Sequence, residues 1–292
     1  MRFVHVNRSA TPHAARNVSD TFLAQLRLGP VHLTVTDLDR SVSFYQDAIG
    51  LRQHSRDGDV AALGAGGEDL LVLHEAPFAK PAGRHAGLYH VALLHPSREE
   101  LARALVRLAN TRTYIEGASD HGISEAIYLP DPDGNGLELA ADRPREAWPA
   151  NWGELRPQPL DMHGLIALVA TEEPSRHADP GLSVGHLHLH VGDVELGLAF
   201  YRDVLGFELQ ALLPSAAFVS AGGYHHHLGF NVWRGTGVPP APPGTVGLRE
   251  WTAVLPQDAL ETALARLDGA GVPRDGELTL DPWGNALRFV AA

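Results

Sequence analysis

Cysteine is absent from the 292 residues of this chain. Disulfide bonds, thiolate zinc sites and cysteine nucleophiles are therefore excluded, and any metal must be bound by nitrogen and oxygen atoms. Long apolar runs are also absent, since no segment approaches the roughly 20 residues that a membrane-spanning helix needs. Residues 1–27 lack the continuous apolar centre of a signal peptide. We therefore expect a cytoplasmic protein with no membrane partner.

Basic residues are few, because 23 Lys and Arg stand against 35 Asp and Glu, and the formal net charge is -12. A surface that binds nucleic acid needs clustered positive charge, so nucleic acid is not expected as a partner. A small molecule is the better candidate. Histidine, by contrast, is plentiful, with 17 copies whose positions decide whether they bear on function.

The chain is internally repeated. Two segments align without gaps, GPVHLTVTDLDRSVSFYQDAIGL from Gly29 and GHLHLHVGDVELGLAFYRDVLGF from Gly185. Each predicts an alternating strand, an Asp at a helix start, and a helix that ends at glycine. A second pair, from Gly87 and from Gly247, again predicts a strand followed by an amphipathic helix. We call the units that begin at these four glycines modules 1 to 4, in chain order.

Modules 2 and 4 end in the similar turns DPDGNGLEL and DPWGNALRF, which predict a tight turn into a last strand. The pattern predicts an α+β protein. A proline-rich stretch separates the two halves by composition. The expected organisation is an N-terminal extension at 1–27, a first domain of modules 1 and 2 at 28–143, a linker at 144–180, and a second domain of modules 3 and 4 at 181–292.

These repeats resemble the vicinal oxygen chelate superfamily, which includes glyoxalase I, bleomycin-binding proteins and type I extradiol dioxygenases. The stretches TDLDRSVSFYQDAIGL, GDVELGLAFYRDVLGF, DPDGNGLELAADRPREAW and SAGGYHHHLGFNVW are similar to its catechol-2,3-dioxygenase branch. The resemblance implies four βαβββ modules, paired into two domains with open, cupped mixed sheets. It also implies a metal bound on a concave face by residues of first and last strands.

Carried over to this sequence, the resemblance implies that His90 and Glu138 bind the metal. The position expected for a third ligand in module 1 holds Pro30, which offers no ligand atom. His32 follows two residues later, on the same face of the expected strand, and is the substitute there. The expected ligand set is thus His32, His90 and Glu138.

The order His121, Ile127, Tyr128, Asp131, Pro132, Gly134 and Glu138 follows the signature of extradiol dioxygenases, with Ser119 as one departure. By that resemblance, His121 would act as an acid or base and Tyr128 would hydrogen-bond the substrate. Each also has a structural interpretation, as a loop histidine and as an aromatic that packs a strand.

Weaker candidates for a second metal site lie in the C-terminal half. They are His186, His227 and Glu250. Arg288 occupies the position that corresponds to Glu138, where its positive charge either disfavours a cation or serves to bind an anionic substrate. We therefore expect this half to be structural or to set specificity.

The leading hypothesis is a ring-cleaving dioxygenase that uses Fe(II), with Mn(II) as the alternative metal, on a small aromatic diol and dioxygen. A glyoxalase-like isomerase or lyase is the second interpretation. The third is a metal-free protein that binds small molecules. Loops 76–84 and 238–245 are expected to shape the pocket, and a homo-oligomer is compatible with the sequence.

Overall fold

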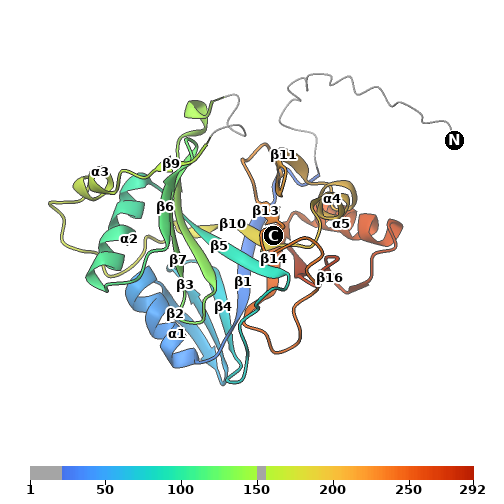
Figure 1. Ribbon diagram of the computed structural model, residues 1–292, viewed down its shortest axis with the longest axis horizontal. Coiled ribbons are helices and arrows are strands. Elements are labelled where there is room, and N and C mark those ends of the chain that lie inside the picture. The colour runs from blue at the N-terminus through green and yellow to red at the C-terminus, as the bar shows by residue number, and fades with distance from the viewer. Residues whose placement is uncertain (1–21, 150–155) are drawn as a thin grey trace.

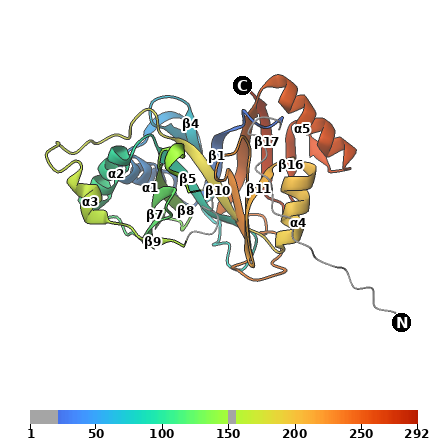
Figure 2. The ribbon, with the colours of Figure 1, turned by 90° about the horizontal axis from the view of Figure 1, so that it is seen from above.

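The computed structural model describes residues 22–149 and 156–292 as two mixed β-sheets flanked by helices. Most of the expected N-terminal extension and a few linker residues lie outside this range. The helices of modules 1 and 2 occupy one flank, and those of modules 3 and 4 the opposite flank (Figures 1 and 2). None of the helices in the described part of the chain has the length and apolar character needed to cross a membrane.

Each module is a strand, a helical segment and three further strands. Module 1 comprises β1 (Arg27–Val35), α1 (Leu38–Phe44), η1 (Tyr45–Ile49), β2 (Arg52–Asp57), β3 (Val60–Gly64) and β4 (Asp69–Glu75). Module 2 comprises β5 (Gly87–His95), α2 (Arg98–Asn110), β6 (Gly117–Asp120), β7 (Ser124–Pro130) and β8 (Gly136–Asp142). Module 3 comprises β10 (Ser183–His190), α4 (Val194–Leu198), η4 (Ala199–Val204), β11 (Glu208–Leu213), β12 (Ala216–Ser220) and β13 (Leu228–Asn231). Module 4 comprises β14 (Gly247–Leu255), α5 (Gln257–Gly269), β15 (Arg274–Asp275), β16 (Leu278–Leu280) and β17 (Ala286–Ala291). The segment between modules 2 and 3 adds η2 (Arg145–Ala147), β9 (Gln158–Pro159) and α3 (Met162–Ala167).

Local chemistry explains where the helices after β1 and β10 begin and end. The side chains of Asp37 and Asp193 cap the first turns, each accepting from a backbone N–H three residues on at 2.9 Å. The chain leaves these helices at Gly50 and Gly206, whose φ angles of 86° and 90° suit glycine.

The first strands of the modules join the modules into sheets. β1 pairs antiparallel with β14, and β5 pairs antiparallel with β10. The strand orders are β15-β16-β17-β14-β1-β4-β3-β2 and β11-β12-β13-β10-β5-β8-β7-β6-β9, so both sheets are open. We call them the 1/4 sheet and the 2/3 sheet. The expected α+β fold of four modules in two open sheets is confirmed.

Each sheet thus combines one module from each half of the chain. Within a half, a buried tyrosine joins the modules instead. Tyr45 donates to Asp131 at 3.1 Å, and Tyr201 donates to Asp281 at 2.7 Å. The buried apolar side chains form one continuous core with members from all four modules. The domain boundaries at 28–143 and 181–292 stay a prediction.

Candidate metal centre

Three adjacent strands of the 2/3 sheet bring two histidines and a glutamate together. His90 lies on β5, Glu138 on the neighbouring strand β8, and His186 on β10 at the other side of β5. Glu138 and His186 both pair in register with Ala92, which stands between them. His90 precedes Ala92 by two residues and so faces the same side of the sheet. The register therefore directs all three side chains to one point.

The ligand atoms of these residues lie within 4.8 Å of one another. His90 Nε2 is 3.0 Å from Glu138 Oε2, and His186 Nε2 is 3.1 Å from the same oxygen. All three side chains are buried. Although His90 Nε2 is close to the carboxylate, it lacks a partner in hydrogen-bonding geometry. A buried nitrogen of this kind, beside a second imidazole and a carboxylate, fits a shared divalent metal with nitrogen and oxygen ligands.

The electrostatics of Glu138 favour its ionised form. Burial by itself would raise the pKa of this carboxyl group. The imidazoles of His186 and His90 outweigh that effect and hold the pKa well below its usual range. The site therefore presents a buried carboxylate charge, which a bound cation would stabilise. His90, Glu138 and His186 together could bind a divalent metal.

His121 and Tyr128 lie next to this group and contact each other. His121 Nε2 and the Tyr128 hydroxyl are 2.8 Å apart. Tyr128 stands opposite Glu138 in the β7–β8 register. Burial, followed by the charge of Glu138, raises the pKa of Tyr128, and burial lowers the pKa of His121. The phenol is thus held protonated and the imidazole neutral. Both residues line a cavity of about 430 Å³ together with His90, Glu138 and His186.

Three further histidines line the same cavity, His188, His225 and His226, and none of them was an expected ligand of this site. His188 follows His186 on the same face of β10, and its Nε2 accepts from the Asn231 amide at 2.9 Å. The ring of His226 lies 4.1 Å from that of His186, centroid to centroid. The alternating letters HLHLH of β10 carry the signal for His188. The run Tyr224 to His227 indicated histidines in this region but not which of them reach the cavity.

The expected third ligand, His32, does not join the group. It lies on β1 in the 1/4 sheet, where its Nδ1 is 2.9 Å from His74 Nε2. The physical reason is the pairing of first strands, because β5 pairs with β10 rather than with β1. His186, expected only as a weaker candidate for a second site, takes the place beside His90 and Glu138.

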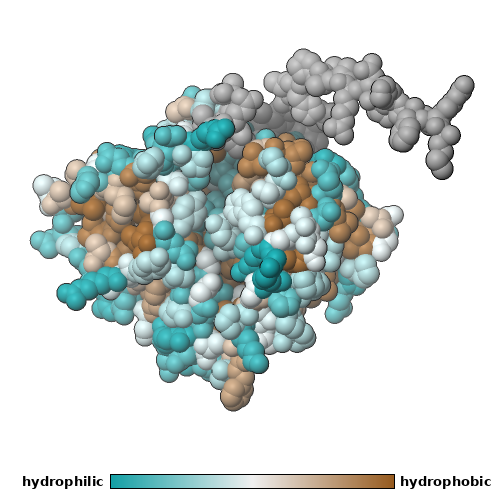
Figure 3. Space-filling view, in the orientation of Figure 1, coloured by the Kyte–Doolittle hydropathy of each residue, from teal (hydrophilic) through white to brown (hydrophobic). Residues whose placement is uncertain are grey.

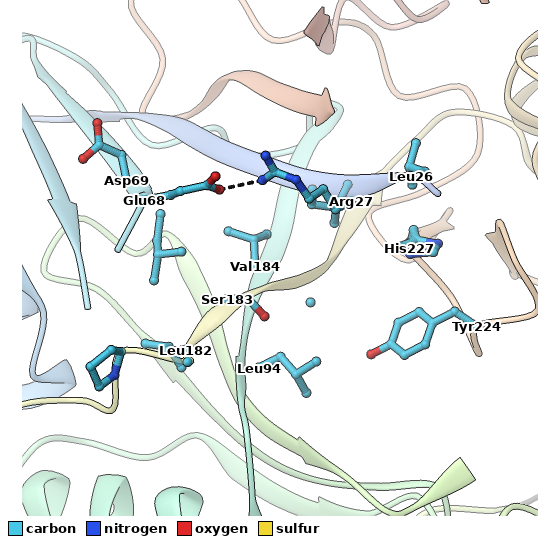
Figure 4. Close-up of a pocket in the computed structure, with 15 residues that line it drawn as sticks. Leu26, Arg27, Glu68, Asp69, Leu94, Leu182, Ser183, Val184, Tyr224 and His227 are labelled. Atoms are coloured by element: carbon cyan, nitrogen blue, oxygen red, sulfur yellow. Dashed lines mark hydrogen bonds and ion pairs between the residues drawn. The ribbon is translucent and has the colours of Figure 1, made fainter. Parts of the chain in front are cut away.

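The other weak candidates are also apart. Glu250 faces Arg288, whose Nε and Nη2 donate to its two oxygens at 2.6 and 2.9 Å. That ion pair occupies the 1/4 sheet positions that correspond to His90 and Glu138. His227 lies near Tyr224 in a separate hollow of about 420 Å³ between the sheets (Figure 4). Its Nδ1 accepts from the Ala221 backbone N–H at 3.2 Å. Among the described residues, these side chains form no second group suited to a metal.

Loops 76–84 and 238–245 do not shape this cavity. Pro81 to Gly83 and Pro240 to Thr245 line a different hollow, of about 620 Å³. The walls near the candidate metal centre come instead from β11, β12 and the turn after β13.

Comparisons with known proteins agree with this geometry. The sequence profile of the Glyoxalase/Bleomycin resistance protein/Dioxygenase superfamily matches residues 27–139 and 183–291. A protein from Bacillus subtilis (strain 168) named catechol-2,3-dioxygenase is 42% identical over 253 residues, which are 84% of this chain and 88% of that protein. Glyoxalase I from Zea mays superposes with a TM-score of 0.55 at 18% identity, covering 91% of this chain and 92% of its own. The cppA protein of Streptococcus pneumoniae TIGR4 does so with a TM-score of 0.55 at 14% identity, covering 90% and 97%. The two structural matches show the fold alone.

Proposed function

Since the chain belongs to the glyoxalase/bleomycin resistance protein/dioxygenase superfamily, we propose that it is an Fe(II)-dependent extradiol dioxygenase acting on a catechol-like aromatic diol. The observation that carries the proposal is the convergence of His90, Glu138 and His186 beside the His121–Tyr128 pair. The name of the 42% identical relative supports it.

The three proposed ligands are the residue types of the 2-His-1-carboxylate set that binds Fe(II) in oxygenases and leaves coordination positions open. Mn(II) is the alternative, because ligand type does not separate the two metals. When bound, such a metal would lower the pKa of a diol hydroxyl and bring diol and dioxygen together.

The neighbouring side chains would handle protons. Tyr128, whose pKa is raised, would stay protonated and donate a hydrogen bond to a substrate oxygen. His121, whose pKa is lowered, would be neutral near pH 7. In the tautomer that carries its proton on Nε2, it would donate to the Tyr128 oxygen, which leaves the phenol proton for the substrate and Nδ1 as the atom able to accept a proton. The contact between the two at 2.8 Å would hold both in place.

The test is turnover by the whole chain. Protein purified without oxygen is loaded with Fe(II), and catechols are added with dioxygen while oxygen uptake and the yellow ring-fission product are followed. We expect equal amounts of oxygen consumed and product formed. Glu138→Gln should abolish turnover, whereas Glu250→Gln, which changes a carboxylate of the other sheet, should not. If metal-loaded protein cleaves no catechol, the proposal is wrong, and turnover without oxygen uptake would instead indicate an isomerase or lyase.

A further inference from the structure

One wall of the cavity beside the candidate metal centre is apolar. It is formed by Leu213 of β11, Phe218 of β12 and Trp233 in the turn after β13. Leu213 and Trp233 are 44% and 51% exposed, which is high for large apolar side chains. Figure 3 shows a hydrophobic patch over β11 at the edge of a hollow. We call these three residues the apolar wall.

The apolar wall stands one side chain away from a proposed ligand. The rings of His90 and His188 lie 5.2 Å apart, centroid to centroid. His188 in turn lies 5.3 Å from Trp233 and 5.5 Å from Phe218. A diol held at the centre would therefore direct its ring, or a group attached to the ring, toward the apolar wall.

Hydrogen bonds hold the indole of the apolar wall in place. Trp233 Nε1 donates to Ser215 Oγ at 3.0 Å, and its backbone N–H donates to Asn231 Oδ1 at 3.0 Å. The same Asn231 donates to His188. Because its orientation is set by these contacts, the wall is an ordered surface for a ligand.

Among the described residues, the cavity offers no permanently charged cation to pair with an anionic substituent. Among the described residues that line it there is no lysine and no arginine, and its carboxylate, Glu138, is negative. A carboxylate on the substrate would lose its hydration there without gaining an ion pair. The volume of about 430 Å³ lies in the usual range of roughly 300–1,000 Å³ for small-molecule pockets, which leaves room beyond a bare diol ring.

We propose that the substrate is a catechol that carries an uncharged, apolar substituent, which packs against Leu213, Phe218 and Trp233. This inference rests on the proposed function, because the diol at the metal sets the direction of the substituent. Each methylene buried against the wall should tighten binding about four-fold, the ratio that about 0.8 kcal/mol gives. A carboxylate of similar size should weaken binding.

The first experiment measures binding without turnover. Fe(II)-loaded protein under nitrogen is titrated with catechol, 4-isopropylcatechol and 3,4-dihydroxybenzoate, and the dissociation constants are obtained by calorimetry. The isopropyl and carboxylate groups are close in shape, so charge is the main difference. We expect 4-isopropylcatechol to bind at least ten-fold more tightly than 3,4-dihydroxybenzoate. Equal binding, or tighter binding of the carboxylate, overturns the inference.

Two neighbouring leucines provide a matched pair of variants. Leu213→Ala removes part of the apolar wall, whereas Leu212→Ala changes an adjacent leucine of β11 that is 51% exposed and does not line the cavity. Leu213→Ala should lose several-fold of the affinity for 4-isopropylcatechol and leave unsubstituted catechol unchanged. Leu212→Ala should change neither. Equal effects of the two substitutions would contradict the role of the wall.

A charge placed on the wall tests the inference in the opposite direction. Leu213→Arg should bind 3,4-dihydroxybenzoate at least ten-fold more tightly than the wild type does.

Oxygen uptake, measured on the same samples, distinguishes failure of this inference from failure of the proposed function. If the protein binds the substituted catechols with the expected difference in affinity but no oxygen is consumed, the proposed dioxygenase activity is wrong and the role of the apolar wall is supported. If catechol is cleaved but the substituents do not change the affinity, the inferred role of the apolar wall is wrong and the proposed dioxygenase activity is supported.

Discussion

At the scale of single residues, the third ligand of the candidate metal centre could be His32 of module 1 or His186 of module 3. The two lie in repeated first strands, at positions two residues apart in the alignment. His32 corresponds to His188 in the alignment of modules 1 and 3, and Pro30 corresponds to His186. The resemblance placed the third ligand in module 1. The structure instead places His186 of module 3 beside His90 and Glu138.

We predict that His186→Ala weakens metal binding at least about 100-fold. The reason is that removing even a residue that only hydrogen-bonds to a metal ligand typically lowers metal affinity by about 10- to 100-fold. His32→Ala should bind metal as the wild type does, since its ring contacts His74 in the other sheet. Bound metal is measured by elemental analysis after competition with a chelator. Equal loss of metal in both variants would show that the centre is not the one described.

Tyr128 gives a second residue-level prediction. Tyr128→Phe removes the hydroxyl that contacts His121 but keeps the ring. Turnover should fall by about 10² to 10⁴, the usual contribution of a positioned proton donor or acceptor. Metal content should not change. Tyr114→Phe, at a tyrosine 69% exposed, is the control and should keep full activity. Full activity of Tyr128→Phe would remove this residue from the proposed chemistry.

At the scale of elements, the close approach of β5 and β8 depends on a glycine. A Cβ at Gly136, the first residue of β8, would lie 1.9 Å from the Tyr89 carbonyl oxygen. That oxygen belongs to the residue before His90. An alanine there must therefore push apart the two strands that carry His90 and Glu138.

We predict that Gly136→Ala lowers the free energy of unfolding by roughly 1–3 kcal/mol, the usual cost of overpacking. It should also weaken metal binding, because Glu138 lies two residues along the same strand. Gly117→Ala is the matched control, since Gly117 begins β6 and a Cβ there meets nothing within 4 Å. Its stability should stay within about 0.5 kcal/mol of the wild type. Urea unfolding and metal titration measure both variants, and equal stability of the two would contradict the prediction.

Much of each element could be predicted locally. Asp37 and Asp193 were expected at helix starts and Gly50 and Gly206 at helix ends, and the structure shows these roles. The widening of both helices into the π-helical turns η1 and η4 was not expected. Hydrophobic spacing alone does not distinguish a π-turn from the end of an α-helix.

At the scale of the whole molecule, burial of neutral histidines makes stability depend on pH. Burial, with the nearby charge of Arg107, lowers the pKa of His95 to about 3, and burial lowers the pKa of His190 to about 4. Between pH 6.5 and these values the unfolded chain binds more protons than the folded chain. The stabilisation is thus complete above pH 6.5 and is lost as pH falls.

We predict that the free energy of unfolding decreases from pH 6.5 to pH 4, with each of these histidines contributing up to about 1.4 kcal/mol per pH unit. His95→Leu should flatten this slope, because both ring nitrogens of His95 are buried without hydrogen-bond partners. His163→Leu, at an exposed position on α3, should leave the slope unchanged. Urea denaturation at a series of pH values provides the measurement. A slope in His95→Leu equal to that of the wild type would contradict the account.

The sequence by itself determined the four repeated units, the alternation of their strands, and the turns and caps that bound them. Through its resemblance to a known family, the sequence also pointed to His90, Glu138, His121 and Tyr128, which lie within one module. Only the tertiary structure decided which modules share a sheet, and with it the place of His186 and of the apolar wall. The reason is physical: all four first strands have similar patterns, so their pairing depends on how whole modules pack. His186 reaches the site across the pairing of β5 with β10, so its role cannot be assigned from the sequence of either strand alone.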